Sequence, residues 1–111
     1  MDLPLPLEHE KILVCFQMPR KQIIWWTTVI KKIIPCQEQH TRAIANVDYE
    51  KGQDSSGNSY KAELGTIKFL KGDRLLASSD DSSFPKGSET RWRPYADKAS
   101  KVIEEEEKKY D

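Results

Sequence analysis

The chain has 111 residues, of which 37% are hydrophobic and 32% are charged, and this composition fits one globular domain with a single small core. Basic and acidic residues number 18 each, so the formal net charge of zero argues against a dedicated nucleic-acid binder. No apolar run approaches the ~20 residues that span a bilayer, and the first residues form no basic leader, so neither a membrane segment nor a secretion signal is expected.

Residues 3–7 alternate Leu and Pro, and because proline fixes φ and restricts the residue before it, the sequence predicts an extended lead-in over 1–10. Five runs rich in apolar and β-branched residues follow, separated by polar turns. We expect a bulge or sharp bend at Gly65, inside the fourth run. The predicted strands cover residues 11–17, 23–34, 41–49, 60–70 and 74–78.

Short loops join these runs, which favours an antiparallel meander, and strong curvature favours closure into a small barrel. We therefore predict a mostly β fold, a five-stranded antiparallel barrel over residues 11–95. The segment 78–90 is rich in Ser, Asp, Gly and Pro and predicts a loop, after which Trp92 anchors the returning chain. Residues 96–111 lack Gly and Pro and predict a C-terminal helix with a charged, frayed end.

Two adjacent tryptophans, Trp25 and Trp26, lie near the start of the second run. Neighbouring side chains of a strand point to opposite faces, so the two rings are expected on different sides of the sheet. We predict that Trp26 faces a partner and that Trp25 packs elsewhere. The two predicted faces are Trp26, Thr28 and Ile30 on one side and Trp25, Thr27 and Val29 on the other.

No catalytic, metal-binding or cofactor-binding motif is visible. His9 and His40 lie in polar segments and belong to no nucleophile or metal pattern. Cys15 and Cys36 have no metal-ligand spacing, and we expect two reduced thiols in an intracellular protein. The sequence therefore predicts a protein that is not an enzyme and that holds no cofactor or metal.

Aromatic residues at the predicted strand ends suggest a binding site. Phe16 ends the first strand, Trp26 begins the second, and Tyr49 ends the third beside Asp48 and Glu50. A closed meander can bring these ends to one rim. Rings around a gap, with a carboxylate beside them, attract a methylated ammonium group by cation–π interaction, at ~0.5–2 kcal/mol per ring.

The segments Ile12–Phe16, Trp26–Ile30 and Ala45–Tyr49 together resemble the Tudor, PWWP and chromo-barrel superfamily. In that family an aromatic residue ends strand one, another opens strand two, and a hydrophobic-x-aromatic element ends strand three. Residues 24–27 are similar to the PWWP signature, with Ile24 and Thr27 in place of its two prolines. The resemblance covers roughly residues 11–78.

This resemblance implies an SH3-like or Tudor-like barrel whose cage rings are Phe16, Trp26 and Tyr49, with Asp48 or Glu50 as the acid. It further implies a non-catalytic chromatin reader that binds methylated Lys or Arg in a histone-like protein tail. Such a protein is nuclear and belongs to a larger complex. On this hypothesis, Trp26→Ala and Tyr49→Ala abolish peptide binding and leave the fold intact.

Two other functions remain open. One is a nucleic-acid-binding barrel that contacts DNA phosphates through basic residues in a salt-sensitive way. The other is a protein-interaction domain without a cage, in which Trp26 fills an interface; this hypothesis gains weight if the cage positions do not converge. The candidate DNA contacts are Arg20, Lys21, Lys31 and Lys32 around the first hairpin and Arg91 and Arg93 beside Trp92.

Overall fold

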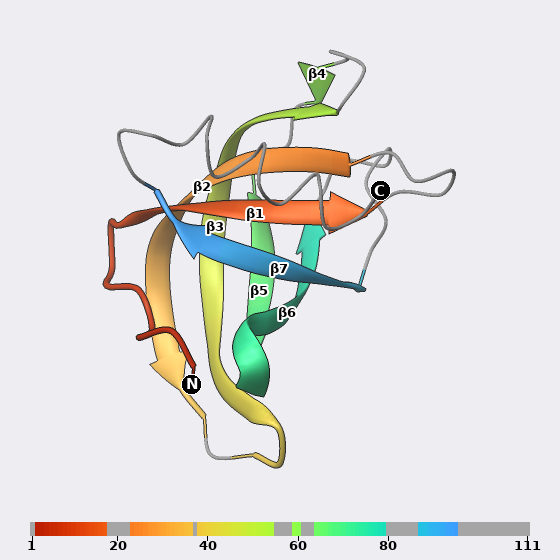
Figure 1. Cartoon of the computed structure of the whole chain (residues 1–111). Coiled ribbons are helices and arrows are strands. Elements are labelled where there is room, and N and C mark those ends of the chain that lie inside the picture. Colours follow the sequence, from red (N-terminus) through yellow and green to blue (C-terminus); the bar gives the residue numbers. More distant parts are fainter. Residues whose placement is uncertain are drawn as a thin grey trace.

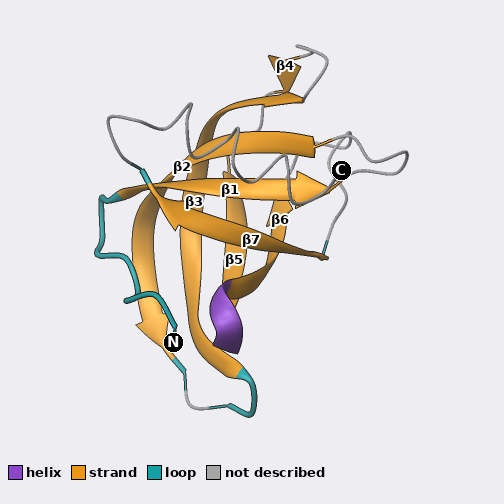
Figure 2. Ribbon diagram, viewed as in Figure 1, coloured by secondary structure: helices purple, strands orange, loops and turns teal. Residues whose placement is uncertain are grey.

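The computed structural model describes residues 2–17, 23–36, 38–54, 59–60, 64–79 and 87–95. This part of the chain is mostly β-structure, with one 3-10 turn at Lys71–Asp73 (Figure 2). No helix within it is long and apolar enough to cross a membrane. The strands are β1 (Lys11–Gln17), β2 (Ile23–Pro35), β3 (Thr41–Asp54), β4 (Ser59–Tyr60), β5 (Leu64–Leu70), β6 (Arg74–Ser79) and β7 (Ser88–Pro94).

Six of these strands close into an antiparallel barrel, as Figure 1 shows. The strand order is β2-β1-β7-β6-β5-β3, and β3 pairs back onto β2. The short β4 pairs with the far end of β3 and lies outside this ring. Each strand of the ring thus lies beside its neighbours in the chain, and the pairing of β7 with β1 joins the last strand to the first. Closure removes the free edges through which sheets aggregate.

The longest strands, β2 and β3, bend because their pairing is interrupted twice. The register shifts between Thr27 and Thr28 and again between Ile30 and Lys32, where Lys31 is an extra residue on β2. Such bulges increase the local twist and bend of a strand. The two ribbons therefore curve along the barrel wall, as seen in Figure 1.

Aromatic rings fill the interior of the barrel. Trp26 and Tyr49 meet edge to face with 5.2 Å between ring centroids, and Phe69 and Trp92 do the same at 5.3 Å. Pairs of this geometry stabilise a core beyond the area they bury, by ~0.5–1.5 kcal/mol each. Small side chains on the same inner face leave room for these rings: Ala43, Ala45 and Ala77.

The segment before β1 runs down the left side of the barrel in Figure 1, and polar contacts fasten its first residues near the lower end. Oδ1 of Asp2 accepts a hydrogen bond from the Gly72 amide at 2.8 Å, and Oδ1 of Asp73 accepts one from the Leu3 amide. The Arg42 guanidinium lies 3.8 Å from the Asp2 carboxylate and 3.9 Å from that of Asp73. The segment also adds apolar side chains to the core: Leu3 and Leu5.

The structure confirms a mostly β, antiparallel barrel and corrects its strand number from five to six. Ser88–Pro94, predicted partly as loop, forms β7 between β1 and β6. Of the bulge or sharp bend predicted at Gly65, the bulge is wrong, because Gly65 pairs in regular register with Val47 on one side and Ser79 on the other. The helix predicted over residues 96–111 lies outside the described residues.

Candidate functional site

The two described cage rings, Trp26 and Tyr49, are core residues. Trp26 is 0% exposed and Tyr49 is 3% exposed, and the two rings pack against each other. The predicted sharing of a face by Trp26, Thr28 and Ile30 is confirmed, since all three are buried. Trp26, predicted to face a partner, is instead enclosed, because this face is the inner face of the barrel.

The Tyr49 ring packs closely on the backbone of the neighbouring strand β5. Its ring lies against Gly65, where an added Cβ would be 2.2 Å from Tyr49 Cε2. Burial raises the pKa of the Tyr49 phenol above its usual value, because the phenolate would lose its hydration. Tyr49 therefore stays neutral and apolar in character, which suits a core ring.

The structure describes no complete cage, because neither Phe16 nor the two carboxylates are seen beside the Trp26 and Tyr49 rings. The Phe16 backbone pairs with Ile24, and its side chain lies outside the described part of the structure. Asp48 forms an ion pair with Lys31 at 3.7 Å, and Glu50 forms one with Lys11 at 3.3 Å. Both carboxylates are solvent-exposed in part, whereas Trp26 and Tyr49 point into the interior.

The basic residues predicted to contact DNA fall into separate groups. Lys31 and Lys32 lie on the part of β2 that pairs with β3, whereas Arg91 and Arg93 lie on β7, which pairs with β1. Arg93 donates a hydrogen bond from Nη1 to the Trp92 carbonyl oxygen at 2.8 Å. The remaining two, Arg20 and Lys21, lie outside the described residues.

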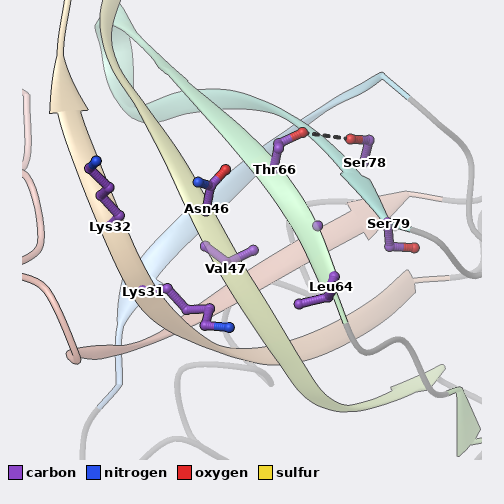
Figure 3. A pocket seen from close by; sticks show the side chains of 9 residues that line it. Lys31, Lys32, Asn46, Val47, Leu64, Thr66, Ser78 and Ser79 are labelled. Atoms are coloured by element: carbon purple, nitrogen blue, oxygen red, sulfur yellow. Dashed lines mark hydrogen bonds between the residues drawn. The ribbon is translucent and has the colours of Figure 1, made fainter.

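An open groove of about 430 Å³ lies on the outer surface, across β2, β3, β5 and β6 (Figure 3). Strand pairing places four polar residues side by side across its floor, because Asn46 is opposite both Lys32 and Thr66, and Thr66 is opposite Ser78. We call this set the polar row: Lys32, Asn46, Thr66 and Ser78. Thr66 Oγ1 and Ser78 Oγ share a hydrogen bond of 2.8 Å.

The groove also has apolar and charged borders. Leu64, 49% exposed, lies beyond the polar row on β5, and the Lys31 side chain lies across β3 toward it in Figure 3. Ile44 and Ile34, which pair with each other and are 39% and 52% exposed, do not line this groove. The groove therefore offers hydrogen-bonding groups beside one exposed aliphatic side chain and a lysine.

Sequence reasoning identified Lys31 and Lys32 but missed the other members of this groove. Asn46 lies between the buried Ala45 and Val47, and Thr66 is followed by the buried Ile67, so their outward direction follows from the pattern. Their alignment across four strands depends on the register, which no local pattern specifies.

Reactive and metal-binding groups are sparse in the described part of the chain. No group of three or more His, Cys, Asp or Glu residues there lies close enough to hold a metal ion. Cys15 is buried, Cys36 is half-buried, and neither is in a disulfide bond. Comparison with known protein families, with curated proteins and with solved structures finds no match to this chain.

Proposed function

We propose that this barrel is a non-catalytic protein-interaction module that binds an extended segment of a partner along the outer groove. The observation that supports this proposal most is the groove itself, an open hollow with a polar floor and the exposed Leu64 at its border. Hydrogen bonds and apolar contacts of this kind recognise peptides in extended conformation. Among the predicted alternatives, this function corresponds to the interaction domain without a cage.

Local charge pairing favours a protein segment over a nucleic acid as the partner. Lys31 is paired with Asp48, Lys68 with Glu38 at 3.8 Å, and Arg74 with Glu89 at 2.6 Å. A phosphate-led interface needs a continuous field of unpaired cations, whose counterions are released on binding. Binding to a short DNA duplex, measured against salt concentration, tests the nucleic-acid alternative.

Binding of a methylated tail by Phe16, Trp26 and Tyr49 remains a second candidate. The observation in its favour is the 5.2 Å contact between the Trp26 and Tyr49 rings, since both belong to the predicted cage. The rings would have to separate to admit an ammonium group. With this candidate we also propose a nuclear location and membership of a larger complex, because both follow from the same family resemblance.

Selection from a phage-displayed library of random peptides tests the proposed function and requires no assumption about the identity of the partner. The wild type should enrich peptides that no longer bind Thr66→Arg, because the long cationic side chain fills the groove. Leu7→Arg is the control, since Leu7 is 75% exposed and does not line the groove.

Circular dichroism must show that both variants fold. If the selected peptides bind Thr66→Arg as well as they bind the wild type, the groove is not the binding site. A trimethyl-lysine peptide that binds far better than its unmethylated form, and equally well to Thr66→Arg, would instead support the methylated-tail candidate.

A further inference from the structure

We infer that the outer face of β1 is a docking surface for the C-terminal residues of the same chain, 96–111. This inference goes beyond the proposed function, because the groove lies on β2, β3, β5 and β6. Its basis is the burial of two side chains of β1 that point away from the barrel interior. We call the surface around them the β1 face, which consists of Leu13 and Cys15 with Arg91 and Arg93 of β7 beside them.

The first step is the burial of β1 on both of its sides. Ile12 and Val14 belong to the core inside the barrel. Side chains alternate along a strand, so Leu13 and Cys15 point outward. Leu13 is nevertheless only 3% exposed and Cys15 is 0% exposed. Thr66, which points outward from β5, is exposed by comparison. Some part of the chain therefore covers the β1 face.

The strands on either side of β1 do not account for this cover. Leu13 lies between Thr27 of β2 and Arg93 of β7, and both of these residues are only half-buried. Cys15 is opposite Arg91, which is exposed. Side chains on one face of a sheet stand roughly perpendicular to it, so neighbours shield the flanks of a residue and leave its tip open. The cover must therefore come from chain that lies over the sheet.

The second step is the place where residues 96–111 begin. The Tyr95 amide donates a hydrogen bond to the Lys11 carbonyl oxygen at 3.3 Å, so the chain leaves β7 beside the first residue of β1. Leu13 is two residues farther along β1, about 7 Å at the rise of a strand. Even at the short rise of a helix, residues 96–111 would span about 24 Å. The seven residues of β1 span about 23 Å, so the segment is long enough to cover them all.

The other long segments outside the described part of the chain are less well placed. Residues 18–22 join β1 to β2 at the end of β1 that is far from Lys11. Residues 80–86 join β6 to the start of β7, which lies at that same far end. The segments beside β4 follow β3, which β2 separates from β1. Only residues 96–111 begin at the end of β1 that is nearer to Leu13.

The third step is the apolar content of the segment. Leu13 and Cys15 need an apolar cover, because a polar group laid over them would lose its hydration without gaining a partner. Residues 96–111 supply three closely spaced apolar side chains: Ala99, Val102 and Ile103. Their contact with the β1 face contributes ~25 cal/mol for each Å² that it removes from water.

The fourth step is charge complementarity. Arg91 and Arg93 flank the inward-facing Trp92 in the sequence, so both guanidinium groups lie on the outer side of β7. The acidic run Glu104–Glu107 follows directly after the apolar residues of the segment. Opposite charges beside an apolar contact fix how two surfaces align, and salt weakens their attraction. A partner of the β1 face would have to displace residues 96–111, whereas the groove stays open.

The Cys15 thiol provides the test, in the full-length chain. In the wild type, N-ethylmaleimide should modify Cys15 far more slowly than the half-buried Cys36, as measured by mass spectrometry. Ile103→Asp should speed the modification of Cys15 by about tenfold or more, because local opening becomes easier, and should leave Cys36 unchanged. Phe84→Asp is the matched control, because it places the same charge in another segment, and Cys15 should stay slow.

Hydrogen exchange at the amide of Ile67, a core residue, shows whether a variant opens the whole barrel. Faster modification of Cys15 with unchanged exchange at Ile67 supports the inference. If both rates rise, a second variant decides, in which glutamine replaces all four glutamates of Glu104–Glu107. At low salt it should speed modification of Cys15 and leave exchange at Ile67 unchanged.

Two results would overturn the inference. One is a Cys15 thiol that stays as slow as in the wild type in both the Ile103→Asp and the glutamine variants. The other is a Cys15 thiol that Phe84→Asp exposes as much as Ile103→Asp does, which would assign the cover to residues 80–86.

Discussion

The ring of Tyr49 lies so close to the backbone of Gly65 that a Cβ atom at Gly65 would be 2.2 Å from Tyr49 Cε2. The same atom would be 2.3 Å from the carbonyl oxygen of Ser78 on the neighbouring strand. An aromatic ring that covers a strand glycine compensates for the packing that the missing side chain would have supplied. Because glycine has no side chain, the Tyr49 ring can occupy the space above Gly65 in the barrel interior.

Gly65→Ala should destabilise the barrel by about 2–3 kcal/mol, because both the ring and the β6 backbone must move. Urea unfolding measures the change. Gly87→Ala is the comparison, since a Cβ added at position 87 would meet no atom within 4 Å beyond its chain neighbours, and the change carries only the cost of the φ of +68°. That cost is about 1 kcal/mol. Equal losses in the two variants would contradict the close packing of Tyr49 on Gly65.

Trp26→Ala should lower the free energy of unfolding by about 3–5 kcal/mol, a large part of the total stability of a small domain. The reason is that Trp26 is 0% exposed and packs on Tyr49. Tyr95→Ala, at a ring that is 48% exposed, should change stability by less than about 0.5 kcal/mol. A Trp26→Ala protein of wild-type stability that fails to bind peptide would revive the cage hypothesis.

The wrong orientation of Trp26 has a physical explanation. Alternation shows which residues share a face, but Thr27 and Val29 on one face look as apolar as Thr28 and Ile30 on the other. Which face is interior depends on the partners of the strand, and Trp26 is opposite Val14 of β1, which is itself fully buried. In β3 the apolar residues Ala45 and Val47 alternate with the polar Asn46 and Asp48, and this pattern indicates which face is interior.

The missed strand β7 and the missed groove share another cause. Trp92 is the single hydrophobic residue of β7 apart from its terminal proline, so the strand carries no apolar alternation of its own. It becomes a strand because β1 and β6 supply hydrogen-bonding partners on both sides. Likewise, Ser78 becomes part of a binding surface only through its pairing with Thr66, which depends on the register of two strands.

The buried phenol of Tyr49 should make stability depend on pH in the alkaline range. Its folded-state pKa is raised by burial, so the folded protein holds this proton more tightly than the unfolded chain. The stabilisation is complete below the unfolded pKa of about 10, and it is lost above that value at up to ~1.4 kcal/mol per pH unit. Urea unfolding at increasing pH should show this loss in the wild type and a smaller loss in Tyr49→Phe. Tyr95→Phe should keep the wild-type dependence.

The Arg42 guanidinium should stabilise the barrel more than that of Arg74. Arg42 is mostly buried between Asp2 and Asp73, whereas the Arg74–Glu89 pair is about half exposed and is screened by water. We expect Arg42→Ala to cost about 1–3 kcal/mol and to speed hydrogen exchange at the Leu3 and Gly72 amides.

The control for this comparison is Arg74→Ala, which should cost less than about 1 kcal/mol and leave those amides protected. The contrast tests whether the N-terminal segment is held by the Asp2, Arg42 and Asp73 contacts or by its apolar residues alone. Unchanged exchange at Leu3 in Arg42→Ala would show that packing of Leu3 and Leu5 is sufficient.

Thr28→Val should leave the barrel as stable as the wild type or stabilise it by about 1 kcal/mol. Thr28 is 0% exposed, and its hydroxyl has no hydrogen-bond partner within the described part of the chain. A buried hydroxyl without a partner costs free energy, which a methyl group of similar size removes. Thr66→Val is the matched comparison, because its hydroxyl is exposed and bonded to Ser78 at 2.8 Å, so this change should be neutral or weakly destabilising. A loss of stability above about 1 kcal/mol in Thr28→Val would indicate that a buried water satisfies the Thr28 hydroxyl.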